Sequence, residues 1–316
     1  MSDVFEPRIV VLAGGVSTER EVSLGSGRAC AAALAGRWST RLVDVTERAL
    51  PLGLDPDHDV VFSTLHGTFG EDGGMQQLLE DAGLAYAGGR VASSQLTFDK
   101  DATKRLLAET AHMTVPADVK FSGTNKPSAA DLMAKLGEGV VIKPNCGGSS
   151  VGLSICSRRA EIESALATIE AGDWLAEQKI VGREVTVGVI QGQALPVVEI
   201  VPKSGVFDYE AKYTKGLTEY LAPAPIDAAL ATKLQGEAEL AYSGAGCRDY
   251  ARIDFMITEK NDCFLLEINT LPGMKETSLL PMGARCAGME FTELVGELVS
   301  PAILRLVTRL GSGGVS

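Results

Sequence analysis

Two apolar runs separated by a short polar turn constrain the fold of this chain more than any other segment does. Both runs lie within residues 252–269, and the turn between them extends from Glu259 to Asp262. An apolar run, a polar turn and a second apolar run predict a β-hairpin. Side chains that share one face of these two strands should therefore lie close together.

Carboxylate and amide side chains face each other in this predicted hairpin. Side chains alternate between the faces of a strand, so Arg252 shares a face with Asp254, and Glu267 with Asn269. A turn centred between residues 260 and 261 places Asp254 opposite Glu267 and Arg252 opposite Asn269, with Cβ atoms about 5 Å apart. Two facing carboxylates repel unless a cation lies between them, and such oxygens suit Mg²⁺. The alternative is an exposed polar face on an edge hairpin.

The N-terminal third repeats a pattern of strand, glycine-rich loop and helix. A strand at 8–13 ends at Gly14-Gly15, and a strand at 59–64 precedes the loop 65–74, while helical patterns follow at about 21–36 and from Met75. This repetition predicts a small doubly wound α/β unit. In such units ligands bind at the loops that follow the strands.

A glycine- and serine-rich loop follows a predicted strand that ends at Lys143. Glycines at 147, 148 and 152 let backbone N–H groups approach an anion, serine hydroxyls add donors, and Lys143 can neutralise phosphate charge. The loop has neither the P-loop pattern nor the dinucleotide fingerprint. Taken alone, the loop could equally be a simple turn.

The connector between two later strands is a second candidate for nucleotide binding. It covers residues 177–184, where backbone groups near Ile180 could hold a base and Glu184 could hold a ribose. A solvated hairpin tip is the alternative.

The rest of the chain alternates helices and strands. Expected helices lie at about 101–110, 127–136, 158–170 and 226–245, expected strands at about 184–190 and 193–200, and a polar loop at 203–220.

Composition excludes several classes of protein. The net charge of −12 disfavours binding to nucleic acid. No apolar run reaches 18 residues, so no transmembrane helix is expected, and the N-terminus lacks a secretory signal. The six cysteines are scattered without a C-x-x-C pair, which indicates free thiols in a reducing cytoplasm. Three histidines make a histidine-based metal site a poor prospect.

Taken in order, these motifs resemble the ATP-grasp superfamily and, within it, the D-alanine–D-alanine ligase family. The resemblance extends over nearly the whole chain. The matching segments are 14–23, 65–73, 143–152, 208–213, 252–255, 267–274 and 278–279.

The resemblance implies a mixed α/β (α+β) protein with the ATP-grasp fold. It implies an N-terminal doubly wound α/β domain over 1–99, a central subdomain over 100–183, and a C-terminal subdomain over 184–316 that carries the metal site and a lid loop. ATP would lie between the central and C-terminal parts. The implied reaction joins two D-alanine molecules through a D-alanyl phosphate, giving D-alanyl-D-alanine, ADP and phosphate for peptidoglycan precursor synthesis.

The resemblance also implies cofactors and partners. The cofactors are ATP and two Mg²⁺ ions, for which Mn²⁺ could substitute. The partners are small molecules, with no nucleic acid and no membrane, and the protein would be a homodimer in the cytoplasm.

The residues implied to bind the nucleotide and the metal lie on the loops and the hairpin. Those for ATP are Lys100, Lys143, Ser149, Ser150, Glu177, Ile180, Glu184, Lys212, Met256 and Leu266. Those for magnesium are Asp254, Glu267 and Asn269.

Further residues are implied to bind the amino acids. Glu19 would receive the ammonium of the first D-alanine, with His66 nearby, and Arg252 and the backbone at Gly273 would stabilise the oxyanion. Two more sets follow: Ser278 and Leu279 for the carboxylate of the second D-alanine, and Glu19, Ser149 and Tyr213 as a hydrogen-bonded triad that closes the site.

The sequence departs from the family pattern beside the pocket for the second amino acid. Lys275 replaces a usual threonine, and Glu276-Thr277 replaces a common Ser-His pair; in the phosphate loop, Cys146-Gly147 replaces an often charged pair. A ligase with another acceptor, such as a D-hydroxy acid or an L-amino acid, is therefore one alternative, although Tyr213 favours an amine. A nucleotide-binding relative without catalysis is a second, and a dinucleotide dehydrogenase a distant third. The loop 203–220 could be a lid or a surface connection.

Overall fold

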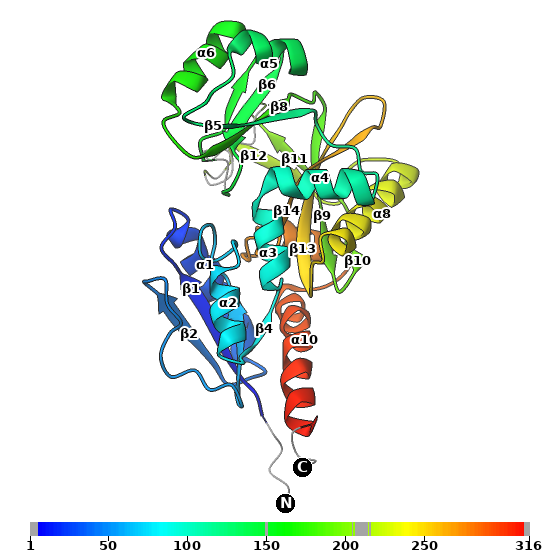
Figure 1. Cartoon of the computed structure of the whole chain (residues 1–316). Helices are drawn as coiled ribbons and strands as arrows, with labels where there is room; N and C mark the ends of the chain where they lie inside the picture. The colour runs from blue at the N-terminus through cyan, green and yellow to red at the C-terminus, as the bar shows by residue number, and fades with distance from the viewer. Residues whose placement is uncertain (1–5, 149–150, 204, 206–213, 215, 313–316) are drawn as a thin grey trace, which may run out of the picture.

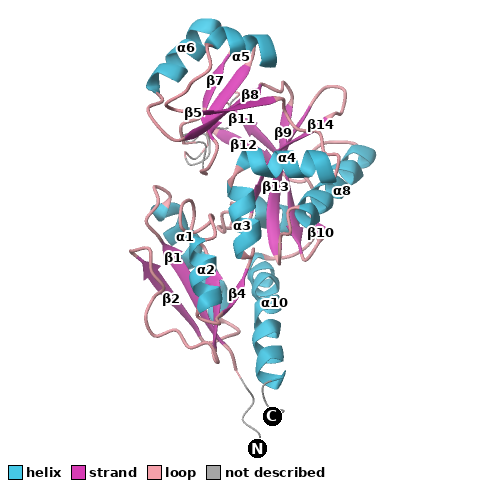
Figure 2. Cartoon of the chain, in the orientation of Figure 1, coloured by secondary structure: helices cyan, strands magenta, loops and turns pink. Residues whose placement is uncertain are grey.

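Three β-sheets with their covering helices make up the protein. The computed structural model describes residues 6–148, 151–203, 205, 214 and 216–312. Each sheet is built from a different part of the chain, as Figure 1 shows by colour. Helices and strands are mixed throughout (Figure 2), so the predicted mixed α/β class is confirmed.

The first sheet is parallel and belongs to the N-terminal part. Its strand order is β2-β1-β3-β4. The strands are β1 (Arg8–Gly14), β2 (Thr40–Val45), β3 (Asp59–Ser63) and β4 (Ala85–Ala87), with α1 (Arg20–Ala35) and α2 (Gly74–Asp81) between them. The predicted α/β unit is confirmed.

The last helix of the chain packs against this first sheet. Helix α10 (Phe291–Ser312) lies beside β4 in Figure 1, and its residues Leu298 and Leu306 share a buried core with Ile9 and Phe62. The C-terminus of the chain therefore stabilises the N-terminal sheet.

The second sheet is antiparallel, with the order β5-β8-β6-β7. Its strands are β5 (Asp118–Ser122), β6 (Val140–Pro144), β7 (Ser154–Cys156) and β8 (Asp173–Gln178), and the helices are α5 (Ala129–Leu136) and α6 (Arg159–Thr168). Leu132 and Leu136 of α5 pack with Ile162 and Leu166 of α6 over the sheet.

The third sheet has the strand order β12-β11-β9-β13-β14, and β10 pairs with β9. The strands are β9 (Arg183–Ile190), β10 (Gln193–Ala194), β11 (Val198–Pro202), β12 (Thr218–Leu221), β13 (Tyr250–Ile257) and β14 (Cys263–Asn269). The helices are α3 (Val91–Phe98), α4 (Lys100–Thr110), α8 (Ala228–Gly244) and α9 (Leu279–Cys286). Helices α3 and α4 contact β14, and α8 and α9 contact β9.

Two expectations for this sheet were wrong in part. The strand expected at 193–200 is divided into β10 and β11, because Pro196 between them has no N–H for a strand ladder. The polar loop expected to end near Tyr220 already forms β12 from Thr218, paired with β11.

Side-chain caps explain where three of the expected helices begin. The carboxylate of Asp99 accepts a hydrogen bond at the start of α4, the hydroxyl of Ser128 does so for α5, and Asp227 does so for α8. Such caps satisfy N–H groups that have no partner within the helix.

The predicted hairpin is confirmed, with one correction to its register. Asp254 pairs with Glu267 and Arg252 with Asn269, as expected. Nearer the turn the expected pairing is wrong, because Phe255 pairs with Leu265 and a β-bulge leaves Leu266 as the extra residue. Bulges commonly redirect side chains beside functional sites.

Candidate active site

Two adjoining cavities are lined by all the predicted site residues that the structure describes. The first cavity, of about 340 Å³, lies between the second and third sheets. The second cavity, of about 620 Å³, lies where the N-terminal loops meet β14 and the start of α9. Both cavities are lined by Lys100, Gly147, Gly148 and Glu267, so they meet at these four residues.

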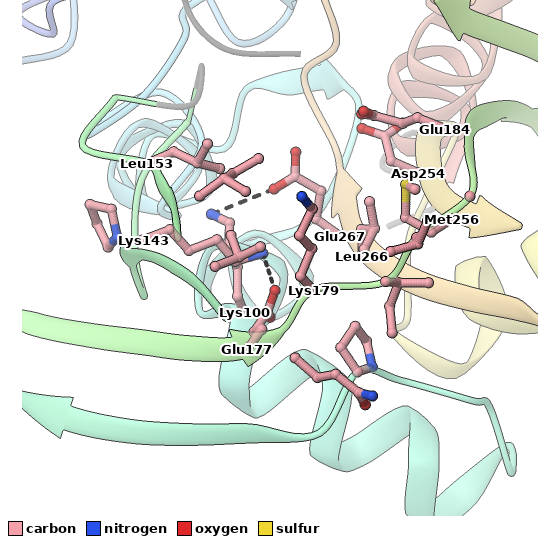
Figure 3. A pocket seen from close by; sticks show the side chains of 18 of the residues that line it. Lys100, Lys143, Leu153, Glu177, Lys179, Glu184, Asp254, Met256, Leu266 and Glu267 are labelled. Carbon is pink, nitrogen blue, oxygen red and sulfur yellow. Dashed lines mark ion pairs between the residues drawn. The ribbon is translucent and has the colours of Figure 1, made fainter. Parts of the chain in front are cut away.

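The first cavity brings together the residues predicted for the nucleotide. They come from α4, β6, β8, β9, β13, β14 and the connector after β8 (Figure 3). Those in its lining are Lys100, Lys143, Glu177, Ile180, Glu184, Met256 and Leu266. The predicted Ser149, Ser150 and Lys212 lie outside the described residues.

Apolar side chains complete the first cavity. Val141, Leu153 and Ile155 line it together with Met256 and Leu266. The extra residue of the bulge, Leu266, is thus part of the wall. Part of the wall of the first cavity is therefore apolar, and charged side chains such as those of Lys100, Glu184 and Glu267 line the rest of it.

A buried carboxylate pairs with two lysines beside the first cavity. The Nζ atom of Lys143 lies 2.7 Å from one carboxylate oxygen of Glu177, and Lys104 contacts the other oxygen. The side chains of Lys104 and Glu177 are 1% and 3% exposed. Burial lowers the pKa of Lys104 to about 8, although the charge of Asp118 opposes this shift.

Lys104 was not among the residues predicted from the sequence. It lies one helical turn after Lys100 on α4, so the two lysines share a face of that helix. That spacing is the sequence signal that could have identified it. Lys100 itself donates to the backbone oxygen of Gly147 at 2.5 Å and lies 3.6 Å from Glu267.

The predicted metal ligands lie on one face of the hairpin. Asp254 and Glu267 are directly paired across the two strands, and Asn269 follows two residues after Glu267. The Oδ1 atom of Asn269 is buried and has no hydrogen-bond partner within the described residues. An unpartnered amide oxygen near two facing carboxylates fits the ligands that Mg²⁺ prefers.

This face holds no larger group of conventional metal ligands. Among the described residues, no three His, Cys, Asp or Glu side chains are close enough together to bind a metal ion. The donor set at the hairpin consists of two carboxylates and one amide. Mg²⁺ commonly binds to so few protein groups when substrate phosphates supply further oxygens.

Arg252 and Asp254 form a buried ion pair on the same face. The distances are 2.9 Å from Nε to Oδ1 and 2.8 Å from Nη2 to Oδ2, and the hydroxyl of Thr186 also donates to Oδ1 at 2.5 Å. Burial alone would lower the pKa of Arg252, but the charge and hydrogen bonds of Asp254 outweigh it and raise the pKa. Arg252 is therefore held in its charged form.

The second cavity brings together the residues predicted for the amino acids. They come from the N-terminal loops, β13 and the segment before α9. Those in its lining are Glu19, His66, Arg252, Gly273, Ser278 and Leu279. The metal-site residues Glu267 and Asn269 line it too.

Two glycine-containing loops converge on Glu19, which is buried. A Cβ atom added to Gly67 or to Gly148 would lie 2.9 Å from a carboxylate oxygen of Glu19. A side chain at either position would therefore displace the carboxylate of Glu19. Tyr213, a predicted partner of Glu19 in the triad, lies outside the described residues.

His66 is held between two side chains at the wall of the second cavity. Its Nδ1 lies 3.4 Å from Oε1 of Glu71 and its Nε2 lies 3.5 Å from the hydroxyl of Ser26. The same hydroxyl accepts a hydrogen bond from the backbone N–H of Met274, at 3.2 Å. Ser26, which the sequence did not single out, thus connects α1 to the loop that carries Gly273.

The start of α9 and the unusual Lys275 lie at one end of the second cavity. Ser278 is the residue before the helix and Leu279 is its first residue. Lys275 lines the same cavity, and its side chain packs on α1, because a Cβ atom added to Gly25 would lie 2.4 Å from its Cε.

Comparison with known proteins identifies the family of the chain. The model of a family described as D-ala D-ala ligase C-terminus matches residues 104–300. A D-alanine–D-alanine ligase of Citrifermentans bemidjiense is 40% identical over 309 residues, which covers 97% of this chain and 99% of that protein. The chain belongs to the D-alanine–D-alanine ligase family.

Solved structures of ligases agree with this assignment. A D-alanine–D-alanine ligase from Bacillus anthracis complexed with ATP has a TM-score of 0.81 at 28% identity, covering 96% of this chain and 99% of that one. The VanG D-Ala:D-Ser ligase from Enterococcus faecalis has a TM-score of 0.79 at 27% identity, covering 94% and 99%. This member of the ligase family therefore has the ATP-grasp fold, as predicted.

In the part of the chain that the structure describes, none of the helices combines the length and the apolar character needed to cross a bilayer.

Proposed function

We propose that this chain joins two molecules of D-alanine in an ATP-dependent reaction that forms D-alanyl-D-alanine, ADP and phosphate. The observation that supports this most directly is the meeting of the two cavities at Lys100 and Glu267. A nucleotide in the first cavity would present its terminal phosphate there, next to an amino acid in the second. The product would serve peptidoglycan precursor synthesis, the role of this ligase family.

The nucleotide would occupy the first cavity with its base toward the connector after β8. Met256 and Leu266 would pack on the base, the backbone near Ile180 and the carboxylate of Glu177 would bind its polar edge, and Glu184 would bind the ribose. The phosphates would point toward the cavity junction. Lys100 and Lys143, with Lys212 from outside the described residues, would neutralise their charge, and the hydroxyls of Ser149 and Ser150 would donate hydrogen bonds to them.

In the first step, the carboxylate of one D-alanine would attack the γ-phosphate of ATP. The bond between that phosphorus and the bridging oxygen breaks, which gives an acyl phosphate and ADP. Phosphoryl transfer needs positioning and neutralisation of charge more than covalent chemistry. Asp254, Glu267 and Asn269 would hold magnesium ions, with Mn²⁺ as a substitute, and these would supply further neutralisation of phosphate charge.

In the second step, the amine of another D-alanine would attack the acyl carbon. The tetrahedral intermediate carries a negative oxygen, which the guanidinium of Arg252 and the backbone N–H at Gly273 would stabilise. Such a donor typically contributes about 2.7–4 kcal/mol. The attacking nitrogen loses a proton to solvent, and the bond between the acyl carbon and the phosphate oxygen then breaks, which releases phosphate and leaves the new peptide bond.

Binding of the two amino acids would be divided along the second cavity. Glu19, beside His66, would receive the ammonium of the first D-alanine, and the N–H groups at Ser278 and Leu279 would receive the carboxylate of the second. The triad of Glu19, Ser149 and Tyr213 would close the site once both are bound. Exclusion of water protects the acyl phosphate from hydrolysis.

The organisation of the protein is part of the same proposal. The domains would be 1–99, 100–183 and 184–316, each carrying one of the three sheets. The protein would act as a homodimer in the cytoplasm, where its small-molecule substrates are found.

The test is an assay of phosphate release from ATP and Mg²⁺ with candidate acceptors. Purified protein receives either D-alanine as the sole amino acid, or D-alanine together with L-alanine, D-serine or D-lactate. The product of each reaction is identified by mass. Release with D-alanine alone, with formation of the dipeptide, is the expected result. Turnover only with another acceptor would leave the proposed mechanism in place but change the second substrate. Lys275, which lines the second cavity, would then be the residue to test for the choice of acceptor. ATP binding without turnover in any mixture would contradict the proposed function.

A further inference from the structure

A third cavity, of about 410 Å³, is lined by four arginines and lies apart from the candidate active site. It shares no lining residue with the first or the second cavity. It forms where the segment after α2 and β4 meet α10 and the residues before β13, a region that Figure 1 shows at the junction of the N-terminal sheet and the C-terminal helix. Its arginines are Arg90, Arg248, Arg305 and Arg309.

The charge of this third cavity opposes that of the whole chain. The net charge of the protein is −12, yet the cavity lining contains four arginines and a single carboxylate, Glu80. That carboxylate accepts a hydrogen bond from the hydroxyl of Tyr86 at 2.6 Å. Positive charge is therefore concentrated in one hollow of an acidic protein.

Part of this arrangement has a structural explanation. The guanidinium of Arg305 binds both carboxylate oxygens of Asp249, at 2.8 and 2.6 Å, and also donates to the backbone oxygen of Tyr86. Arg248 lies 4.4 Å from the ring centre of Tyr86 and donates to the backbone oxygen of Gly88. These contacts connect α10 and the residues before β13 to β4.

Contacts within the protein do not account in the same way for the other two arginines, Arg90 and Arg309. The side chain of Arg90 is exposed and makes no hydrogen bond or ion pair within the described residues. Arg309 donates to the backbone oxygens of Gly83 and Pro56, and its nearest carboxylate, Asp57, is 4.0 Å away. A guanidinium has five N–H donors, so most donors of Arg90 and Arg309 make no hydrogen bond within the described residues.

The positive charges in the third cavity also act on one another. Burial and the charge of the neighbouring Arg305 lower the pKa of Arg248, and the charge of Arg90 acts in the same direction. Asp249 lies within ion-pair distance of both Arg305 and Arg248, at 2.6 and 3.8 Å, so a single carboxylate partly offsets two of these charges. An anion in the cavity would relieve the remaining repulsion.

We propose that the third cavity binds the phosphate group of a small ligand. The planar fork of a guanidinium matches phosphate oxygens, and a phosphate can accept hydrogen bonds from several arginines that approach from different directions. The volume of the cavity lies within the range of small-molecule sites. Its arginines come from α10, the segment before β13 and the residue that precedes α3, so a bound phosphate would hold these elements together.

The test is calorimetric titration of the full-length protein with inorganic phosphate and, separately, with AMP, at constant ionic strength set with sodium chloride. Arg90→Gln is the decisive variant, because the side chain of Arg90 has no internal partner and its loss should leave the fold intact. We expect this variant to bind phosphate at least tenfold more weakly, and Arg90→Glu to lose the binding. Arg159→Gln, an exposed arginine of α6 far along the chain from the cavity, is the matched control and should titrate as wild type.

The outcomes separate this site from other phosphate sites on the protein. A ligand phosphate is the occupant if AMP binds more tightly than inorganic phosphate and Arg90→Gln removes that binding; free phosphate is the occupant if the order is reversed. Equal phosphate affinities of wild type and Arg90→Gln would overturn the proposal. The phosphate would then bind elsewhere, for example beside Lys100 and Lys143. Acetate that binds as tightly as phosphate would also overturn it.

Discussion

The first and second cavities adjoin, yet they are built from different kinds of structure. Strands of the second and third sheets supply most of the charged walls of the first cavity, where Lys143 and Glu177 lie on paired strands. Loops and helix starts supply most of the second, where Glu19 and Ser278 each immediately precede a helix. The first cavity thus depends on sheet register, and the second depends on how separate loops are held together.

The two cavities also balance their charges differently. Beside the first, the carboxylate of Glu177 is shared by Lys104 and Lys143. In the second, Arg252 is paired with Asp254, its neighbour on the same strand. On the proposed function, a nucleotide would meet a carboxylate shared by two lysines, whereas an amino acid would meet an arginine that a single carboxylate on its own strand holds charged and in place. Substitutions at the junction, in the second cavity and beside the first should have distinct effects.

The largest effect is expected at the junction, where Glu267 lines both cavities. Glu267→Gln should lower ATP turnover by about 10³-fold, because a lost metal ligand removes several kcal/mol of charge stabilisation. The measurement is phosphate release at saturating substrates, together with the melting temperature. Glu259→Gln, an exposed carboxylate in the turn of the same hairpin, is the control and should keep full activity. Normal turnover in Glu267→Gln would exclude the proposed metal site.

The second cavity is tested by Arg252→Met. Loss of an oxyanion donor should lower kcat by about 10²–10³-fold. Asp254 would also lose its partner, and breaking a buried pair in this way costs roughly 3–5 kcal/mol of stability. Kinetics and denaturant unfolding of the same preparation separate these two consequences.

The control for this substitution is another arginine of the third sheet. Arg183 binds Glu199 at 2.7 and 2.5 Å and lines neither cavity. Arg183→Met should lower stability while kcat stays within about twofold of wild type, as expected for a substitution away from the substrate-binding groups. Equal losses of kcat in the two variants would mean that Arg252 acts through the fold alone.

The sequence predicted best what depends on local periodicity. Alternation along a strand placed Arg252 with Asp254 and Glu267 with Asn269, and the structure confirms both pairs of faces. The predicted pairing of Asp254 with Glu267 was correct, although the pairing nearer the turn is shifted by one residue from the prediction. The bulge at Leu266 takes up this one-residue shift. Such a bulge depends on packing against neighbouring strands, which local patterns do not encode.

The sequence predicted least what depends on partners that are distant along the chain. The pairing of Glu177 with Lys104 and Lys143 joins α4, β6 and β8, and no local pattern indicates it. Strand β2 was missed because it is an edge strand with largely exposed side chains, so it lacks the apolar run that identified β1 and β3.

A second predicted metal ligand, Asp254, also has a structural role. Asp254 is the partner of the buried Arg252 and accepts a hydrogen bond from the hydroxyl of Thr186. Its loss should therefore lower stability as well, so Glu267 is the better position for testing the metal site.

The smallest effect on activity is expected beside the first cavity, at Lys104. This lysine supports Glu177 without lining the cavity, so Lys104→Met should raise KM for ATP a few-fold and leave kcat nearly unchanged. A loss of kcat equal to the change in KM would contradict a role limited to positioning Glu177. The kinetic effect is therefore modest, and the pH dependence of stability gives the sharper test.

The pKa of Lys104 is about 8 in the folded protein, below its ordinary value of 10.5. Between these two pH values the unfolded chain binds the lysine proton and the folded chain does not, so this group makes unfolding less favourable as pH rises. Relative to low pH, the gain in unfolding free energy from this group is complete above pH 10.5 and is lost as pH falls through 8. At 1.36 kcal/mol per pH unit, this gain is roughly 3 kcal/mol. Other groups titrate in the same range, so the informative quantity is the difference in unfolding free energy between wild type and Lys104→Met. That difference should increase in favour of wild type from pH 8 to pH 10.5; a constant difference would show that Lys104 is not the buried lysine with the lowered pKa.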